Sequence, residues 1–223
     1  MTFDRDLAAS WDRNAANWTR VVREGLIPSR RAGTDAAILR AIAERSPRWL
    51  LDIGCGEGWL IRAAEAITGC AGVGIDGSAE LVAAAQAADS VNRYAMLDYA
   101  AFVAGDDDVG GDFDIAVFNY ALFAEDIVPL LRAAARRLTP HGTIIIQTLH
   151  PGAGSEDGWR TEDFAAFGAG DWAPMPWYAR TLEGWRAAVA EAGLTLLEMR
   201  EPKAADGRVL SLLMICECGP SSP

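Results

Sequence analysis

The strongest constraint on the fold is a set of three glycines at alternate positions, which follows an apolar run near residue 50. Within residues 49–60 the chain passes from apolar side chains to Asp52, then to Gly54, Gly56 and Gly58, and then to a helical pattern. This order predicts a buried strand, a tight turn and the start of a helix. Because glycine accepts positive φ and admits a ligand close to the backbone, we expect free amides of the turn to form a polar cradle.

Apolar strands and helical patterns alternate along the rest of the chain, which predicts an α/β fold with a doubly wound sheet. The first strand ends at Asp52, and further strands are expected at 71–76, 91–97, 112–119, 143–149, 194–200 and 209–218. Residues 139–142 are expected to form a turn before the fifth strand. The last two strands adjoin in sequence, so the predicted seven-stranded, mostly parallel sheet has helices on both faces and an antiparallel last strand.

The length of 223 residues favours a single domain over 1–223, with an N-terminal helical segment at 1–45 that we interpret as a lid. Trp11 and Trp18 share one face of the first helix, where they either cover the core or close a ligand site.

The second unusual segment is 150–180, which is crowded with aromatic side chains that include Trp177 and Tyr178. A long insertion after a core strand is more often functional than not, so we interpret it as a substrate pocket and lid. A satellite core or an oligomer contact is the alternative.

The sequence Asp52-Ile53-Gly54-Cys55-Gly56-Glu57-Gly58 resembles the first motif of the class I S-adenosylmethionine (SAM)-dependent methyltransferases. Its G-x-G-x-G spacing differs from the G-x-G-x-x-G of dinucleotide-binding proteins. The strand at 112–119 is similar to the fourth motif of that family, without the double proline of enzymes that methylate nucleic-acid bases or glutamine. The resemblance implies SAM as cofactor and methyl transfer by direct displacement at the sulfonium carbon, with catalysis resting on proximity and alignment.

The resemblance also implies a cofactor site around the turn and the ends of the following strands. Asp76, at the end of the second strand, is suited to accept from both ribose hydroxyls, with Ser78 capping the next helix. Asp98 matches the family's acceptor for the adenine amino group. Arg31 follows Arg30 in a predicted helix start, where a cation asks for an anionic partner such as the SAM carboxylate, or is simply solvated. The expected cofactor contacts are Asp52, Gly54, Cys55, Gly56, Asp76, Gly77, Asp98, Tyr99, Asn119, Tyr120, Arg31 and Trp18.

His150 directly follows the fifth strand, at the edge where the glycine turn and Asn119 also emerge. An imidazole there has three open roles, which are a base toward the acceptor, a structural hydrogen bond, or orientation of the acceptor. The candidate catalytic residues are His150 and Tyr120, and the candidate acceptor contacts are His150, Trp177, Tyr178 and Trp11. His141 is expected at the opposite edge, on the surface.

The formal net charge of −11 disfavours nucleic acid as a partner, and no apolar run is long enough for a membrane span. The four cysteines fit neither a zinc site nor a disulfide framework, which favours a cytoplasmic protein. No metal is expected, because the acids at 106–108 lack calcium-loop spacing. We therefore expect a small-molecule methyl acceptor, while the oligomeric state stays undetermined. The alternatives are a non-catalytic SAM-binding sensor or scaffold and an NAD-dependent oxidoreductase.

Overall fold

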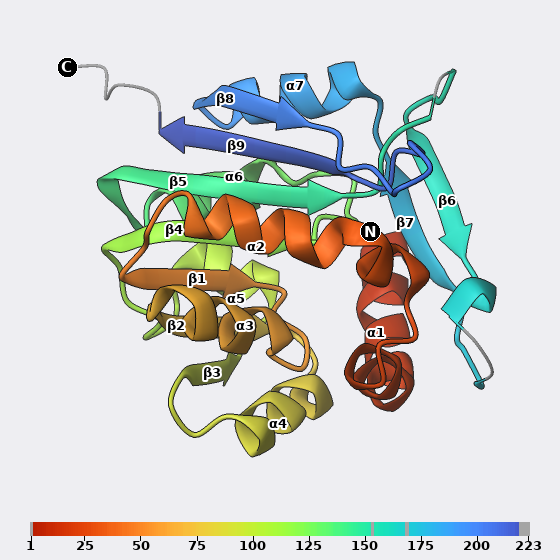
Figure 1. The fold of residues 1–223 in the computed structure, drawn as a ribbon, viewed down its shortest axis with the longest axis horizontal. Helices are drawn as coiled ribbons and strands as arrows, with labels where there is room; N and C mark the ends of the chain where they lie inside the picture. The colour runs from red at the N-terminus through yellow and green to blue at the C-terminus, as the bar shows by residue number, and fades with distance from the viewer. Residues whose placement is uncertain (1, 153, 168–169, 219–223) are drawn as a thin grey trace.

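The computed structural model describes residues 2–152, 154–167 and 170–218, with side chains described from residue 6. Its centre is a seven-stranded sheet in the order β3-β2-β1-β4-β5-β9-β8 (Figure 1). The strands are β1 (Trp49–Ile53), β2 (Ala71–Asp76), β3 (Arg93–Met96), β4 (Phe113–Asn119), β5 (Leu138–Thr148), β8 (Leu194–Arg200) and β9 (Leu212–Cys218). β9 runs antiparallel to both β5 and β8, and the other pairs are parallel, which confirms the predicted sheet.

One apolar cluster lies on each face of this sheet, because successive residues of a strand point to opposite faces. Leu51 and Ile53 belong to one cluster, and Leu50 belongs to the other. The second cluster is covered by α2 (Asp35–Ala43), α3 (Trp59–Thr68) and α4 (Ala79–Ala88), and the first by α5 (Tyr99–Ala104), α6 (Val128–Ala135) and α7 (Leu182–Glu191). Helices on both faces are thus confirmed. Of the helices described, none combines the length and the apolar character that crossing a membrane requires.

Two strand limits differ from the predicted ones for local reasons. β5 starts at Leu138, which pairs with Phe113, and the pairing resumes at Thr143 opposite Ile115. Residues 139–142 therefore bulge within β5, where a turn before the strand was predicted. β3 starts later than predicted because the amides at 91 and 92 donate to the Asp89 carboxylate in a turn.

Three further elements gather at the carboxyl ends of the parallel strands (Figure 1). They are α1 (Thr2–Arg23) and the antiparallel hairpin of β6 (Gly158–Glu162) and β7 (Met175–Ala179), with a 3-10 turn η2 (Ala165–Phe167) between its strands. Asn14 of α1 is fully buried and exchanges two 2.8 Å hydrogen bonds with the backbone of Ala173. The two segments interpreted as lids are therefore joined to each other at this edge of the sheet.

Candidate functional site

The candidate site lies where the order of the strands reverses, because β1 has β2 on one side and β4 on the other. Open α/β sheets bind ligands at the carboxyl ends of the strands at such a point. The glycine turn follows β1, Asp76 ends β2 and Asn119 ends β4. The structure thus brings these three predicted parts of the site to one edge.

The glycine turn depends on positive φ angles at three positions. Gly54, Gly56 and Gly58 have φ of +80°, +55° and +80°. A Cβ on Gly54 would lie 2.6 Å from both the Tyr99 hydroxyl and the Ala121 Cβ, so no side chain fits there. A Cβ on Gly56 would lie 3.6 Å from the Trp18 Nε1, which is an ordinary contact. The turn is therefore tightly packed at Gly54 and also at Gly58, where a Cβ would lie 2.7 Å from the Tyr94 ring, but not at Gly56.

We expect Gly54→Ala to lower the free energy of unfolding by about 2–4 kcal/mol, from the left-handed backbone and from the clash together. Gly69→Ala is the matched control, because Gly69 also has positive φ (+75°) but open space around a Cβ. That control should cost only about 1–2 kcal/mol. Urea unfolding of both variants measures the difference, and equal losses would show that packing against Ala121 and Tyr99 is unimportant.

The turn does not offer the free amides that the sequence led us to expect. The amides of Gly54 and Cys55 both donate to the Ile75 carbonyl, at 2.8 and 3.0 Å. The Gly56 amide donates to Asp76 Oδ2 at 2.9 Å. These internal bonds hold β1 against β2, and they leave the Asp52 Oδ1 as the side-chain atom of this region without a hydrogen-bond partner.

One buried and one partly buried carboxyl group stand beside the turn. Asp52 is 1% exposed, and its Oδ1 has no hydrogen-bond partner. Burial, with a further contribution from the charge of Asp76, raises the pKa of Asp52 to about 8. Burial also raises the pKa of Asp76, against the opposing hydrogen bonds from the amides of Ser78 and Gly56. A cationic ligand beside these groups would favour the ionised form of both.

The raised pKa of Asp52 makes stability depend on pH. Asp52 holds its proton in the folded state up to about pH 8 but loses it near pH 3.8 when unfolded. This contribution is present below pH 3.8 and is lost as pH rises to 8, with a limiting slope of about 1.4 kcal/mol per pH unit. Over the three units from pH 5 to 8 we therefore expect the wild type to lose about 3–4 kcal/mol relative to Asp52→Asn. Urea unfolding at both pH values checks this, and parallel curves would contradict it.

Three predicted cofactor contacts already form hydrogen bonds within the protein. Asp98 is exposed and caps α5, its Oδ1 accepting from the Ala101 amide at 2.8 Å, so its contact with the adenine amino group stays a prediction that depends on the remaining acceptor sites of the carboxylate. The Tyr99 hydroxyl donates to the Ala121 carbonyl at 3.1 Å. Asp76 was expected to be free, with Ser78 as the helix cap. Instead the Ser78 side chain makes no cap bond, and Asp76 Oδ1 accepts from the Ser78 amide.

The remaining predicted residues near the turn lie on different sides of it. Cys55 packs behind the turn, because a Cβ on Gly74 would meet its Sγ at 2.8 Å. Gly77 is exposed, and a Cβ there would lie 3.9 Å from the Cα of Asp98. Asn119 Oδ1 accepts from Gln147 Nε2 at 3.1 Å. The cofactor edge is thus lined by backbone and by the Asp52 and Asp76 carboxyl groups.

Tyr120 combines a strained backbone with an enclosed hydroxyl. Its φ is +55°, which is unusual for a residue with a side chain. Its hydroxyl has no well-formed hydrogen bond, and neither do the buried hydroxyls of Thr34 and Ser211 beside it. Burial raises the pKa of Tyr120, while these two hydroxyls oppose the shift. The Tyr120 hydroxyl therefore faces a buried polar cluster, and the protonated form is favoured.

The arginine pair lies in a different setting from the predicted helix start. Arg30 begins a π-helical turn, η1 (Arg30–Thr34), in which Gly33 has φ of +144°. Arg30 pairs with Asp35 at 2.8 Å and lies over the Trp59 ring at 3.9 Å. Its partner is thus within the chain, while Arg31 is exposed. Of the two, Arg31 alone keeps the predicted role open.

A buried ion pair that the sequence reasoning missed fixes α1 over the glycine turn. The Glu57 side chain is fully buried and binds Arg23 of α1 at 2.8 Å and Arg62 of α3 at 2.8 Å. Trp18 lies over Gly56 next to this contact. The acidic residue within the glycine motif was the available signal, because a carboxylate between glycines of a buried turn needs a partner.

Aromatic side chains from α1 and the β6–β7 hairpin form one cluster. Trp11 contacts Trp18 edge-on at 5.2 Å between ring centroids and stacks on Phe123 at 6.3 Å. Phe123 in turn contacts Trp177 at 6.5 Å. Trp11 and Trp18 are thus core residues of this cluster as well as a cover for the turn, so both alternatives for them hold in part.

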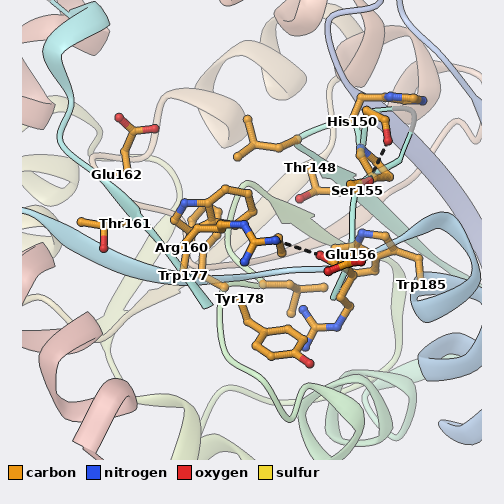
Figure 2. A pocket seen from close by; sticks show the side chains of 17 residues that line it. Thr148, His150, Ser155, Glu156, Arg160, Thr161, Glu162, Trp177, Tyr178 and Trp185 are labelled. Carbon is orange, nitrogen blue, oxygen red and sulfur yellow. Dashed lines mark hydrogen bonds between the residues drawn. The ribbon is translucent and has the colours of Figure 1, made fainter. Parts of the chain in front are cut away.

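A pocket of about 370 Å³ opens between the end of β5 and the hairpin. Figure 2 shows Thr148 and His150 on one side of it and Trp177 and Tyr178 on the other. His150 Nε2 lies 3.1 Å from Glu201 Oε1. Three of the four predicted acceptor contacts therefore line one pocket, while Trp11 lies behind it in the aromatic cluster.

Comparison with known proteins gives one family and many similar folds. The family described as "Methyltransferase domain" matches residues 29–199. A search of curated proteins finds no match by sequence. Among solved structures, the DhpI–SAH complex has a TM-score of 0.71 at 16% identity, with 98% of each chain covered.

Two further structures carry acceptor names in their descriptions. One is Burkholderia thailandensis 1,6-didemethyltoxoflavin-N1-methyltransferase with bound 1,6-didemethyltoxoflavin and S-adenosylhomocysteine (TM-score 0.69, 17% identity, 98% of this chain and 90% of that chain). The other is the sugar N-methyltransferase KedS8 from a Streptoalloteichus species (TM-score 0.61, 20% identity, 83% and 87%). At these identities the likeness concerns the fold.

The family match covers the glycine turn, Asp76, the end of β4 and His150, which are the parts of the predicted site that the fold gathers at one edge. It favours a transferase over the NAD-dependent oxidoreductase and the non-catalytic SAM-binding protein that the sequence left as alternatives. With the antiparallel β9 completing the sheet, the chain belongs to the methyltransferase-domain family of enzymes.

Proposed function

We propose that this enzyme transfers a methyl group from SAM to a small-molecule acceptor bound in the pocket beside β5. The observation that carries the proposal is the pair of carboxyl groups at the glycine turn, Asp52 buried and Asp76 partly buried. SAM carries a sulfonium and an ammonium charge, and both are complementary to this acidic edge. The donor set therefore fits the cofactor.

The residues of the turn would divide the work of holding the cofactor. Each oxygen of Asp76 accepts one amide in the structure and keeps capacity for a ribose hydroxyl, since a carboxylate offers about four acceptor sites. Gly56, which has only Trp18 close to it, would admit the ligand near the backbone. When bound, SAM supplies an activated methyl group on sulfur. Trp18 and Arg31 are the remaining candidates to cover it.

The acceptor side is proposed from the pocket and its lids. Residues 1–45 and 150–180 would form the cover, because α1 and the hairpin are joined through Asn14 and stand at the carboxyl edge. Such a cover excludes water and holds the acceptor in line with the methyl group, which are the main demands of a displacement reaction. The named acceptors of the toxoflavin and sugar enzymes are small molecules, which supports the same class here.

His150 is the proposed proton acceptor for a hydroxyl or ammonium group of the substrate. It lines the pocket, and Glu201 at 3.1 Å orients its ring. Tyr120 is less suited to this role, because its hydroxyl is enclosed with Thr34 and Ser211 and its pKa is raised by burial.

Calorimetry with SAM, S-adenosylhomocysteine and NADH tests the cofactor assignment directly. We expect both adenosyl compounds to bind at micromolar concentrations and NADH to bind at least about 100-fold more weakly, a difference of about 2.7 kcal/mol. Transfer of a labelled methyl group to a fraction of small metabolites then tests the reaction. Tight NADH binding without SAM binding would contradict the proposal.

A further inference from the structure

A buried arginine in the wall of the pocket has only part of its hydrogen-bonding capacity used. Arg180 follows β7, lines the pocket and is 6% exposed. Its Nη2 donates to the carbonyls of Ala124 at 2.5 Å and Glu125 at 2.6 Å. These bonds tie the loop after β4 to the hairpin. They use Nη2 at one end of the guanidinium and leave Nη1 at the other end without a hydrogen bond.

The other end, Nη1, is buried and has no hydrogen-bond partner. In the described part of the chain, no carboxylate forms an ion pair with Arg180. Asp157, a nearby acid, instead accepts from the Thr181 amide at 2.6 Å, at the start of α7. The guanidinium lies between the rings of Tyr178 and Trp185, at 5.0 and 5.1 Å from their centroids. The side chain is thus held in place by stacking but is not neutralised.

A buried cation without a counterion is costly, and buried charges are normally paired. Burial lowers the pKa of Arg180, and Tyr178, Asp157, Glu125 and Asp126, in that order, oppose this shift by their charges. The loop contact by itself does not require a guanidinium with a free second nitrogen. A ligand anion that reaches Nη1 would satisfy both its hydrogen-bonding capacity and its charge.

The lining of the pocket narrows the kind of anion. One free nitrogen supplies the single hydrogen bond that holds one oxygen of a carboxylate, whereas a phosphate with three oxygens requires more donors than this nitrogen offers. Glu156 and Glu162 also line the pocket, so a dianion would be repelled more strongly than a monoanion. Arg160, on the same hairpin, donates only to the carbonyls of Trp159 and Glu156 and adds a second positive charge near the mouth.

We propose that the pocket binds a carboxylate group through Arg180 Nη1, so that the methyl acceptor is a small monocarboxylate with a planar apolar body against Trp177 and Tyr178. The identification of this ligand as the methyl acceptor rests on the proposed function. The carboxylate site itself does not depend on methyl transfer. Arg180 is a binding residue in this assignment, and His150 across the pocket stays free for the proton.

Equilibrium binding of matched probes tests the site without any turnover. Benzoate, phenylacetate and indole-3-acetate are titrated against the full chain with S-adenosylhomocysteine present, each beside its neutral carboxamide. We expect at least one carboxylate to bind about tenfold or more tightly than its amide. Arg180→Met should abolish this preference. Arg93→Met is the matched control, because Arg93 also donates two hydrogen bonds to backbone carbonyls but lies on β3.

Equal binding of all acids and amides by the wild type, or an unchanged preference in a folded Arg180→Met, would overturn the proposal. If Arg180→Met does not fold, nitrogen-15 spectra of the wild-type guanidinium groups decide. The Arg180 signal should then shift with the carboxylate and not with the amide, and a static signal would overturn the proposal. Failure of methyl transfer with intact carboxylate binding would contradict the proposed function alone.

Discussion

His150→Gln is expected to lower kcat by about 100-fold or more with an acceptor that must lose a proton, while SAM affinity stays unchanged. A positioned base contributes about 10²–10⁴ in rate, and glutamine keeps a polar side chain of similar reach but cannot accept the proton. Pro151 holds His150 in an extended conformation, so the ring has a defined direction. The variant should also lose the acidic limb of the profile of kcat against pH.

Two controls separate a base from a structural histidine. His141→Gln should leave kcat unchanged, because His141 is exposed in the bulge of β5 at the opposite edge. Glu201→Gln removes the carboxylate that orients His150, so kcat should fall by a smaller factor than in His150→Gln. Wild-type kcat in His150→Gln, with such an acceptor, would return His150 to a structural or orienting role.

Asp76→Ala is expected to weaken SAM binding by about 100-fold, with the fold retained. A carboxylate that accepts charged hydrogen bonds contributes about 1.5–3 kcal/mol, and 2.7 kcal/mol corresponds to 100-fold. The structure adds a second cause, because Asp76 also holds the amides of Gly56 and Ser78 and so shapes the turn. Calorimetry with S-adenosylhomocysteine measures the loss.

Asp106→Ala is the control for the change of charge, because Asp106 is exposed in the loop before β4. It should bind S-adenosylhomocysteine as the wild type does. Circular dichroism and urea unfolding establish that Asp76→Ala is folded. Unchanged affinity in the folded variant would remove Asp76 from the cofactor site.

Local sequence patterns were sufficient to predict the sheet and the residues at its carboxyl edge. Apolar runs, helix caps such as Thr181 and the glycine turn are short-range signals, and they placed the strands and the antiparallel β9 correctly. The direction of parallel strands then put Asp76, Asn119 and His150 at a common edge without any knowledge of contacts. The hairpin of β6 and β7 was not predicted, because its aromatic residues show no clear alternation of apolar and polar side chains.

Tertiary structure alone decided which polar groups remain available for a ligand. Hydrogen-bond capacity is shared between residues far apart in sequence, so Asp98 became a helix cap and the amides of the turn were taken by Ile75 and Asp76. The same accounting left Asp52 Oδ1 and Arg180 Nη1 buried without partners. Residue type fixes what a side chain can donate or accept, but burial and the position of every competing group determine what it still has to offer.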